Sequence, residues 1–234
     1  MKCIAIIPAR SGSKGLKNKN IKILGGKPLM WYSIQAAIKS ECFDEVMVST
    51  DSEEYAKIAR ECGAMVPFLR SKETAGDLAS SWDSVREVLV NYEKLGKKYD
   101  YVMLLQPTSP LRTMEDIKNA FDVLKTNNAE SVVGMCEMEH SPLWSNVLPE
   151  NGNLRRFIKS EAEVASGRQS LPIYYRINGA IYLTKIDYTS FKFDLYNDRG
   201  FAYKMPQDRS IDIDSELDFR IAEDIMMNQK KEDY

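Results

Sequence analysis

The chain has 234 residues, 44% of them apolar, which is enough for one large α/β domain with a sizeable core. Its 32 Lys and Arg residues are balanced by 34 Asp and Glu, so no general basic field exists for nucleic acid and important cations must be local. No apolar run approaches the ~20 residues of a membrane-spanning helix. The four cysteines share no C-x-x-C spacing, which favours reduced core thiols. We therefore expect a cytoplasmic protein with no nucleic-acid or membrane partner.

The N-terminus indicates an anion site. Residues 3–7 form a short isoleucine-rich run, typical of a strand buried on both faces. A loop rich in glycine and cations follows, containing Arg10, Gly12, Lys14, Gly15, Lys17 and Lys19. Small residues let backbone N–H groups approach a polyphosphate, and the cations neutralise its charge. The loop is not a Walker motif, because Lys14 precedes Gly15, and the alternative is a surface turn with solvated lysines.

Strand and helix patterns then alternate along the chain. Helices are indicated by apolar residues three or four apart, and strands by short apolar runs. In chain order we expect a helix over 30–38, a strand at 46–49, a helix over 53–62, a strand at 65–69, a helix over 82–92, a central strand at 101–105, a helix capped by Thr113 and a strand at 131–135. This order predicts a mostly parallel sheet between two helical layers, a three-layer α/β/α fold.

The alternation breaks between residues 137 and 176, where prolines and glycines interrupt any helical period. This segment is too apolar for a linker, so we expect an excursion that packs against something, such as a second subunit. The predicted organisation is an α/β domain formed by residues 1–136 and 177–234, with a small excursion at 137–176. A strand near 180–183 and a helix over 217–225 complete the domain.

Ligands of parallel sheets bind outside the carboxyl ends of the strands. These ends carry Arg10, Asp51, Arg70 and Gln106. The amide of Gln106 offers a donor and an acceptor that can match the edge of a nucleobase, and prolines soon after it stiffen the loop. An ordinary turn is the alternative.

Asp212 and Asp214 stand two residues apart in an alternating segment. In an extended chain both carboxylates face one side, about 6.6 Å apart at Cα. Oxygen ligands of this kind suit Mg²⁺, which also takes oxygens from substrate phosphates. The alternative is a solvated strand edge in which Asp214 caps the helix that follows.

A third group comprises Arg168, Gln169, Arg176, Asn178 and Gly179. Two arginines near a turn can clamp a carboxylate, and glycine permits close backbone approach. The alternative is a pair of exposed arginines beside a hairpin. His140, the only histidine, is an isolated residue, and no nucleophile–base arrangement is evident. Together the phosphate loop, Gln106, the paired aspartates and the clamp point to nucleotidyl transfer to an acidic acceptor.

Four segments, IIPARSGSKGLKNKNI, LLQPTSPLR, RINGAIY and SIDIDSELD, resemble the acylneuraminate (CMP-sialic acid) cytidylyltransferase family, in the same order from Ile4 to about Ile225. The resemblance implies a three-layer nucleotide-binding sheet, with a small excursion that swaps across a homodimer. It also implies transfer of CMP from CTP to the 2-hydroxyl of a sialic-acid-type 2-keto sugar acid, with release of pyrophosphate. The implied cofactor is Mg²⁺, with Mn²⁺ as an alternative. Lys17 departs from the family pattern, since many relatives carry proline there.

By this resemblance Arg10, Lys19 and Asp212 are the catalytic residues, and Asp212 and Asp214 hold the metal, with Asp212 as the candidate proton acceptor. The nucleotide-binding positions are Arg10, Ser13, Lys14, Lys19, Asn20, Arg70, Ser81 and Gln106. The sugar-binding positions are Gln106, Arg168, Gln169, Asn178 and Tyr182, some of them donated by a neighbouring subunit.

Three alternatives remain open. Legionaminate, pseudaminate or a 3-deoxy-octulosonate are rival sugar acids, because these activating enzymes share the nucleotide half. A sugar-1-phosphate nucleotidyltransferase is disfavoured, because its G-x-G-T-R loop is absent. A catalytically inactive nucleotide sensor is the non-enzyme alternative, and the intact Arg10, Lys19 and aspartate pair argue against it.

Overall fold

The structure is a computed structural model that describes residues 1–12, 15–76, 79–155, 157–158 and 171–232. Its central sheet has six strands in the order β4-β1-β5-β7-β6-β8. In that order their bounds are β4 (Glu45–Ser49), β1 (Cys3–Pro8), β5 (Tyr101–Leu104), β7 (Tyr175–Lys185), β6 (Ser131–Glu137) and β8 (Gly200–Lys204). β1 runs parallel to β4 and β5, and β6 runs parallel to β8.

β7 is the exception, since it is antiparallel to both β5 and β6. The chain leaves β6, passes through the segment 138–174 and returns as the neighbouring strand. Strands joined in this way without a crossover run antiparallel. The start of β7 therefore lies at the edge of the sheet where β1, β4 and β5 end.

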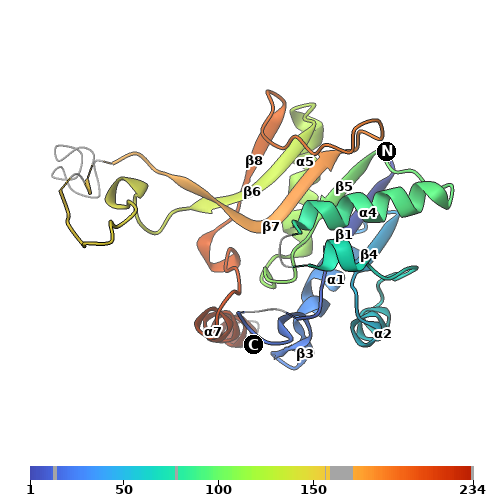
Figure 1. Ribbon diagram of the computed structural model, residues 1–234, viewed down its shortest axis with the longest axis horizontal. Helices are drawn as coiled ribbons and strands as arrows, with labels where there is room; N and C mark the ends of the chain where they lie inside the picture. Colours follow the sequence, from blue (N-terminus) through green and yellow to red (C-terminus); the bar gives the residue numbers. More distant parts are fainter. Residues whose placement is uncertain (13–14, 77–78, 156, 159–170, 233–234) are drawn as a thin grey trace.

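The helices are α1 (Leu29–Ser40), α2 (Glu53–Glu61), α3 (Lys72–Ala75), α4 (Ser81–Lys94), α5 (Met114–Thr126) and α7 (Glu216–Glu232). Short 3-10 turns η1 (Lys19–Ile21), η2 (Pro142–Trp144) and η4 (Gln207–Arg209), and the small hairpin of β2 (Ile23–Leu24) and β3 (Lys27–Pro28), complete the elements (Figure 1). Local sequence explains where several of them begin. Thr113 caps α5 in a reciprocal hydrogen-bonded box with Asp116, as its side chain predicts.

Alternate residues of the buried strands enter two separate cores. Ile4 and Ile6 of β1 pack with α4 on one face, whereas Ala5 and Ile7 pack with α1, α2 and α5 on the other. A strand buried on both faces needs apolar residues at every position, which is the pattern of residues 3–7. The three-layer α/β/α prediction is therefore confirmed.

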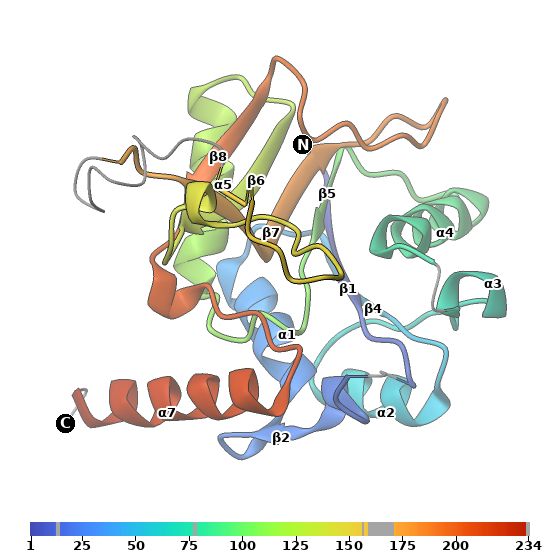
Figure 2. The same ribbon diagram turned by 60° about the vertical axis from the view of Figure 1, so that its left-hand side comes forward.

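A third apolar cluster joins the two ends of the chain. Leu16 and Leu24, from the N-terminal loop and β2, pack against Ile213 and against Phe219 of α7. Figure 2 shows α7 running alongside the β2 region, below the sheet. This packing brings the segment 210–214 next to the loop 10–20, although almost two hundred residues separate them.

Three local predictions differ from the structure. Residues 65–69 form no strand but a single bridge between Met65 and Met47, because Pro67 lacks the N–H that a ladder needs. Residues 210–214 form no strand and pair with none. β8 was not expected, because a five-residue edge strand with mostly exposed side chains leaves little periodic signal.

β6 and β7 extend beyond the helical layers into an arm, whose described residues are 137–155, 157–158 and 171–176 (Figure 1). Several large apolar side chains of the arm are exposed, among them Val147 at 87% and Ile173 at 62%. Its role in dimerisation stays a prediction. Cys3 and Cys136 are buried, Cys42 and Cys62 are half-buried, and all four thiols are free. Within the described ranges, no helix combines the length and apolarity needed to cross a bilayer.

A buried carboxylate ties α5 to the C-terminal part of the sheet. Asp116 accepts hydrogen bonds from the backbone and side chain of Thr113, both at 2.9 Å. It also accepts from Arg209 through two nitrogens, at 2.9 and 3.1 Å, and from the hydroxyl of Tyr203 at 3.0 Å. Burial alone would raise the pKa of Asp116, but these donors outweigh it and lower the pKa below its usual value.

Asp116→Asn should cost about 1–3 kcal/mol of stability near pH 7, the usual effect of weakening charge-assisted bonds at a buried site. Because the folded carboxyl has the lower pKa, the unfolded chain binds its proton first as pH falls. The stabilisation is therefore present above the unfolded value of about 3.9 and is lost as pH falls through the folded pKa. Urea unfolding of wild type and Asp116→Asn between pH 7 and pH 3 measures the difference in their free energies of unfolding. The exposed Glu115→Gln on the same helix is the control. A difference that does not change with pH contradicts the stabilising role of the Asp116 carboxylate.

Candidate active site

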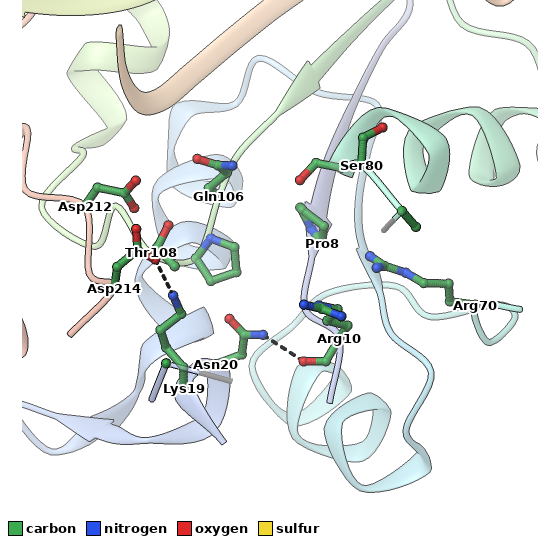
Figure 3. A pocket seen from close by; sticks show the side chains of 14 residues that line it. Pro8, Arg10, Lys19, Asn20, Arg70, Ser80, Gln106, Thr108, Asp212 and Asp214 are labelled. Atoms are coloured by element: carbon green, nitrogen blue, oxygen red, sulfur yellow. Dashed lines mark hydrogen bonds and ion pairs between the residues drawn. The ribbon is translucent and has the colours of Figure 1, made fainter. Parts of the chain in front are cut away.

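A pocket of about 530 Å³ lies at the carboxyl ends of β1 and β5. It is lined by Pro8, Arg10, Gly15, Lys19, Asn20, Arg70, Ala79, Ser80, Ser81, Gln106, Pro107, Thr108, Asp212 and Asp214. Figure 3 shows the two aspartates and Lys19 along one side, Arg10 and Arg70 along the other, and Gln106 between them. The pocket thus separates a carboxylate pair from two guanidinium groups.

The loop after β1 is held in place by its neighbours. Asp51, just past β4, accepts hydrogen bonds from the backbone and the hydroxyl of Ser11 at 2.7 and 2.8 Å. Asn20 donates its amide to the carbonyl of Arg10 at 3.0 Å, and the Arg10 guanidinium donates to the carbonyl of Ala75 at 3.2 Å. Burial acts to raise the pKa of Asp51, but the Ser11 bonds lower it overall, so the carboxylate stays charged.

Lys19 connects this loop to the C-terminal aspartates. Its ammonium donates to the Asp214 carboxylate at 2.8 Å and to the carbonyl of Ile213 at 2.7 Å. Gly15 also lies against this segment, because a Cβ at that position would stand 2.8 Å from the carbonyl oxygen of Asp214. Larger residues would push the loop away from the aspartates, so glycine is needed here for close approach.

Asp212 carries an unpaired, buried oxygen. Its Oδ1 has no hydrogen-bond partner among the described residues. Burial, followed by the charge of Asp214, raises the pKa of Asp212, although a hydrogen bond with the Thr108 side chain acts against this. A buried carboxylate oxygen without a donor is an available ligand for a hard cation. Among the described residues no group of three metal-ligating side chains exists, so the pair would need further oxygens from a substrate or water.

Gln106 and Asp212 meet over Gly179 of β7. A Cβ on Gly179 would lie 2.7 Å from Gln106 Oε1 and 3.4 Å from Asp212 Oδ2. Gly179 also has φ +75°, a conformation that other residues avoid. The absence of a side chain at Gly179 thus lets the Gln106 amide and the Asp212 carboxylate both lie against the backbone of β7.

The remaining walls come from Arg70 and the start of α4. Arg70 donates to the hydroxyl and carbonyl of Ser49 at 3.1 and 3.0 Å, so its guanidinium is fixed at the end of β4. Burial lowers the pKa of Arg70 to about 10, partly offset by Asp51 and Glu87, so it stays a cation at neutral pH. Ser80 caps α4, and with Ser81 it lines the pocket opposite Asp212.

The structure brings together eight residues that the sequence assigned to one site: Arg10, Lys19, Asn20, Arg70, Ser81, Gln106, Asp212 and Asp214. Ser13, Lys14, Arg168 and Gln169 lie outside the described residues. Their assigned roles stay predictions.

Asn178 and Tyr182 do not line the pocket. Asn178 is 1% exposed and donates its amide to Ser210 at 2.9 Å, and its assigned role in sugar binding stays a prediction. The register between β6 and β7 shifts beside Gly134, where an added Cβ would stand 2.7 Å from Asn178 Oδ1. Tyr182 packs edge-on against Trp82, with ring centroids 6.2 Å apart.

Thr108 and Ser80 line the pocket without having been assigned to it. Thr108 bonds the Asp212 side chain and accepts a hydrogen bond from the backbone of Ile213 at 2.8 Å. The sequence signal that could have found Thr108 was its position two residues after Gln106. Ser80 was recognisable in the sequence only as the N-cap of a helix.

Comparisons with known proteins give one consistent result. The sequence model of the family described as Cytidylyltransferase matches residues 4–233. A CMP-N,N'-diacetyllegionaminic acid synthase of Legionella pneumophila is 36% identical, over 98% of this chain and 99% of the relative. An N-acylneuraminate cytidylyltransferase of Streptococcus agalactiae is 39% identical over 94% of this chain, which spans about half (52%) of that protein.

A solved CMP:2-keto-3-deoxy-manno-octonic acid synthetase complexed with CTP has the same fold. It superposes with a TM-score of 0.72 at 16% identity and covers 98% of this chain and 100% of the solved one. The match of the family model to nearly the whole sequence, supported by relatives above 30% identity, leads to a direct conclusion: the chain belongs to the cytidylyltransferase family and is a CTP-dependent nucleotidyltransferase.

Proposed function

We propose that this cytidylyltransferase transfers CMP from CTP to the 2-hydroxyl of a sialic-acid-type 2-keto sugar acid, N-acetylneuraminate or a close relative. The observation that carries the proposal is the single pocket in which Lys19 bonds Asp214, Asp212 keeps an unpaired oxygen, and Gln106 faces the same space. The named activities of both relatives, each on a nonulosonic acid, support the acceptor class.

A legionaminic acid is the second candidate acceptor. The relative named for that activity matches this chain over 99% of its own length, whereas the N-acylneuraminate relative is only 52% covered. Both reactions use the same nucleotide, so the residues around CTP do not separate the two acceptors.

In the proposed reaction the 2-hydroxyl oxygen forms a bond to the α-phosphorus of CTP, and the bond from that phosphorus to pyrophosphate breaks. Asp212, with its raised pKa, accepts the hydroxyl proton. Arg10 and Lys19 approach the pocket from the loop after β1 and balance the negative charge of the phosphates. Gln106 presents its amide to the cytosine or to the sugar acid.

We also propose a Mg²⁺ ion held by Asp212 and Asp214, for which Mn²⁺ is an alternative. The free Oδ1 of Asp212 and the oxygen chemistry of the pair fit such an ion. When bound, the metal supplies charge neutralisation at the phosphate oxygens. The Lys19 ammonium already pairs with the Asp214 carboxylate, so part of the negative charge of the two aspartates is neutralised before substrate binds.

The test is pyrophosphate release by the purified protein with CTP and Mg²⁺. The panel of acceptors is N-acetylneuraminate, N,N'-diacetyllegionaminate, pseudaminate and a 3-deoxy-octulosonate, with the CMP-sugar identified by mass spectrometry. We expect turnover with the first or the second, and none without an acceptor. Asp212→Asn, prepared in parallel, controls for contaminating enzymes. Absence of product with every acid contradicts the proposal and favours the nucleotide sensor.

We further propose a homodimer built through the arm of residues 137–176. Val147→Asp combined with Ile173→Asp places charges on exposed apolar positions of the arm and should yield a monomer, because buried unpaired charges are costly at an interface. Light scattering after size exclusion measures the mass. Ile23→Asp, which changes an equally apolar and 58% exposed residue on β2, should leave the dimer intact. A wild-type protein that elutes as a monomer contradicts the dimer.

A further inference from the structure

The segment that carries Asp212 has little support from its own backbone. Residues 210–214 pair with no strand. Their backbone is fixed to the loop after β5 by one bond, from Ile213 N–H to the carbonyl of Thr108 at 2.8 Å. A catalytic carboxylate must nevertheless be held closely, since a misplacement of about 1 Å can cost on the order of a hundred-fold in rate. Lys19 supports the residues after Asp212, through the carbonyl of Ile213 and the carboxylate of Asp214. The residues before Asp212 must be held by other contacts.

Ser210 supplies one anchor. It is completely buried, and its hydroxyl donates to the carbonyl of Pro206 at 2.7 Å and accepts from the amide of Asn178 at 2.9 Å. Asn178 in turn accepts a hydrogen bond from the backbone of Ala180 at 3.1 Å. Asn178 and Ala180 flank Gly179, over which Asp212 and Gln106 meet. The anchor therefore joins the Asp212 segment to the strand beneath the pocket.

Arg209 supplies a second anchor on the opposite side. Its guanidinium grips the buried carboxylate of Asp116 through two nitrogens. Asp116 also holds Thr113, which ends the loop that carries Gln106 and Thr108. Planar two-point pairing of this kind fixes direction as well as distance. The turn before Asp212 is thus tied to β7 through Asn178 and to the loop that carries Gln106 and Thr108 through Asp116.

We propose that Ser210 and Arg209 are positioning residues for Asp212, and that Asn178 and Asp116 are their anchors. They hold the turn of residues 206–210 so that the unpaired Oδ1 of Asp212 stays in its orientation. This inference rests on the proposed function, because it takes Asp212 as the group that must be oriented. It also gives Asn178 a role that acts through Ser210.

Ser210→Ala is the primary test. Ser210 does not bond Asp212 itself, so its loss acts by displacing the segment. Because a displacement of about 1 Å can cost on the order of a hundred-fold in rate, we expect kcat to fall by about 10–100-fold while KM for CTP changes little. The matched control is Ser131→Ala, because Ser131 is equally buried and also donates to a carbonyl, that of Leu195, at 2.8 Å. Ser131 starts β6 at the opposite edge of the sheet, where it pairs with Thr184.

Mn²⁺ titration gives a readout that does not depend on turnover. Loss of the free Mn²⁺ signal in electron paramagnetic resonance, measured with CTP present, reports the affinity of the site. We expect Ser210→Ala to weaken Mn²⁺ binding by about 10–100-fold, with Ser131→Ala equal to wild type. Thermal melting of both variants records the stability change that each substitution causes.

Arg209→Lys tests the second anchor if Ser210→Ala fails to fold. Lysine keeps the charge beside Asp116 but cannot form the two-point pair, so a partial loss of kcat and of Mn²⁺ affinity is expected. Arg199→Lys is its control. Arg199, just before β8, also pairs with a carboxylate, but through one nitrogen to Glu130 at 3.0 Å, and it donates to the carbonyl of Asn128. It does not line the pocket.

The outcomes separate the two proposals. An active wild type in which Ser210→Ala matches Ser131→Ala, and Arg209→Lys matches Arg199→Lys, in both kcat and Mn²⁺ affinity overturns the positioning inference alone. A wild type that releases no pyrophosphate and takes up no Mn²⁺ with CTP overturns the proposed function, and the inference with it.

Discussion

Asp212→Asn should lower CMP transfer about a thousand-fold, because a metal ion supplies several kcal/mol of charge stabilisation and each factor of ten corresponds to about 1.4 kcal/mol. The substitution keeps the shape of the side chain and one oxygen. It removes the negative charge from the position where Oδ1 has no partner. Steady-state pyrophosphate release measures the effect.

The same variant should melt at a temperature no lower than wild type. Burial and the charge of Asp214 raise the pKa of Asp212, so the ionised form is less favourable in the folded protein than in the unfolded chain. A neutral amide removes that cost at neutral pH. Loss of activity with unchanged or increased stability is the signature of a residue kept for function.

Asp208→Asn is the matched control for this prediction. Asp208 lies in η4, four residues before Asp212, but its side chain is exposed. The same chemical change there should leave turnover near wild type. An Asp212→Asn enzyme that retains full activity would remove the proposed metal site and the proposed proton acceptor together.

Gly179→Ala should cost at least about a hundred-fold in kcat/KM, because the new methyl group displaces a reacting or binding group by on the order of 1 Å. A Cβ at this position would stand 2.7 Å from Gln106 Oε1, closer than real contacts allow. The amide is the end of a flexible side chain, so it can move. The added methyl group therefore displaces the Gln106 amide, and the displacement lowers kcat/KM.

Gly96→Ala separates this collision from backbone strain. Gly96 has the same φ of +75° as Gly179, but a Cβ there would have nothing within 4 Å. Both variants should lose about 1–2 kcal/mol of stability from the left-handed conformation, measured by urea unfolding. Only Gly179→Ala should lose activity. Equal activity of the two variants would mean that the approach of Gln106 to Gly179 has no catalytic importance.

The sequence located the edge of the sheet at which the site lies. Arg10, Arg70 and Gln106 follow apolar runs in an alternating strand–helix order, and parallel strands end at one edge. The start of α5 at Thr113 was also predictable, because capping depends on residues only three apart. Such information is local, and a single sequence contains it.

Tertiary structure decided which distant groups meet. The Asp212 and Asp214 pair was visible as a motif, but Lys19 as its cation and Thr108 as its neighbour follow from the packing of α7 on the N-terminal loop. The burial of Asn178 and its bond to Ser210, 32 residues away, are likewise tertiary features. Periodicity reports which side of an element is buried. Periodicity does not report which other element covers that side. The covering element determines whether a polar side chain faces a ligand or instead supports a residue that does.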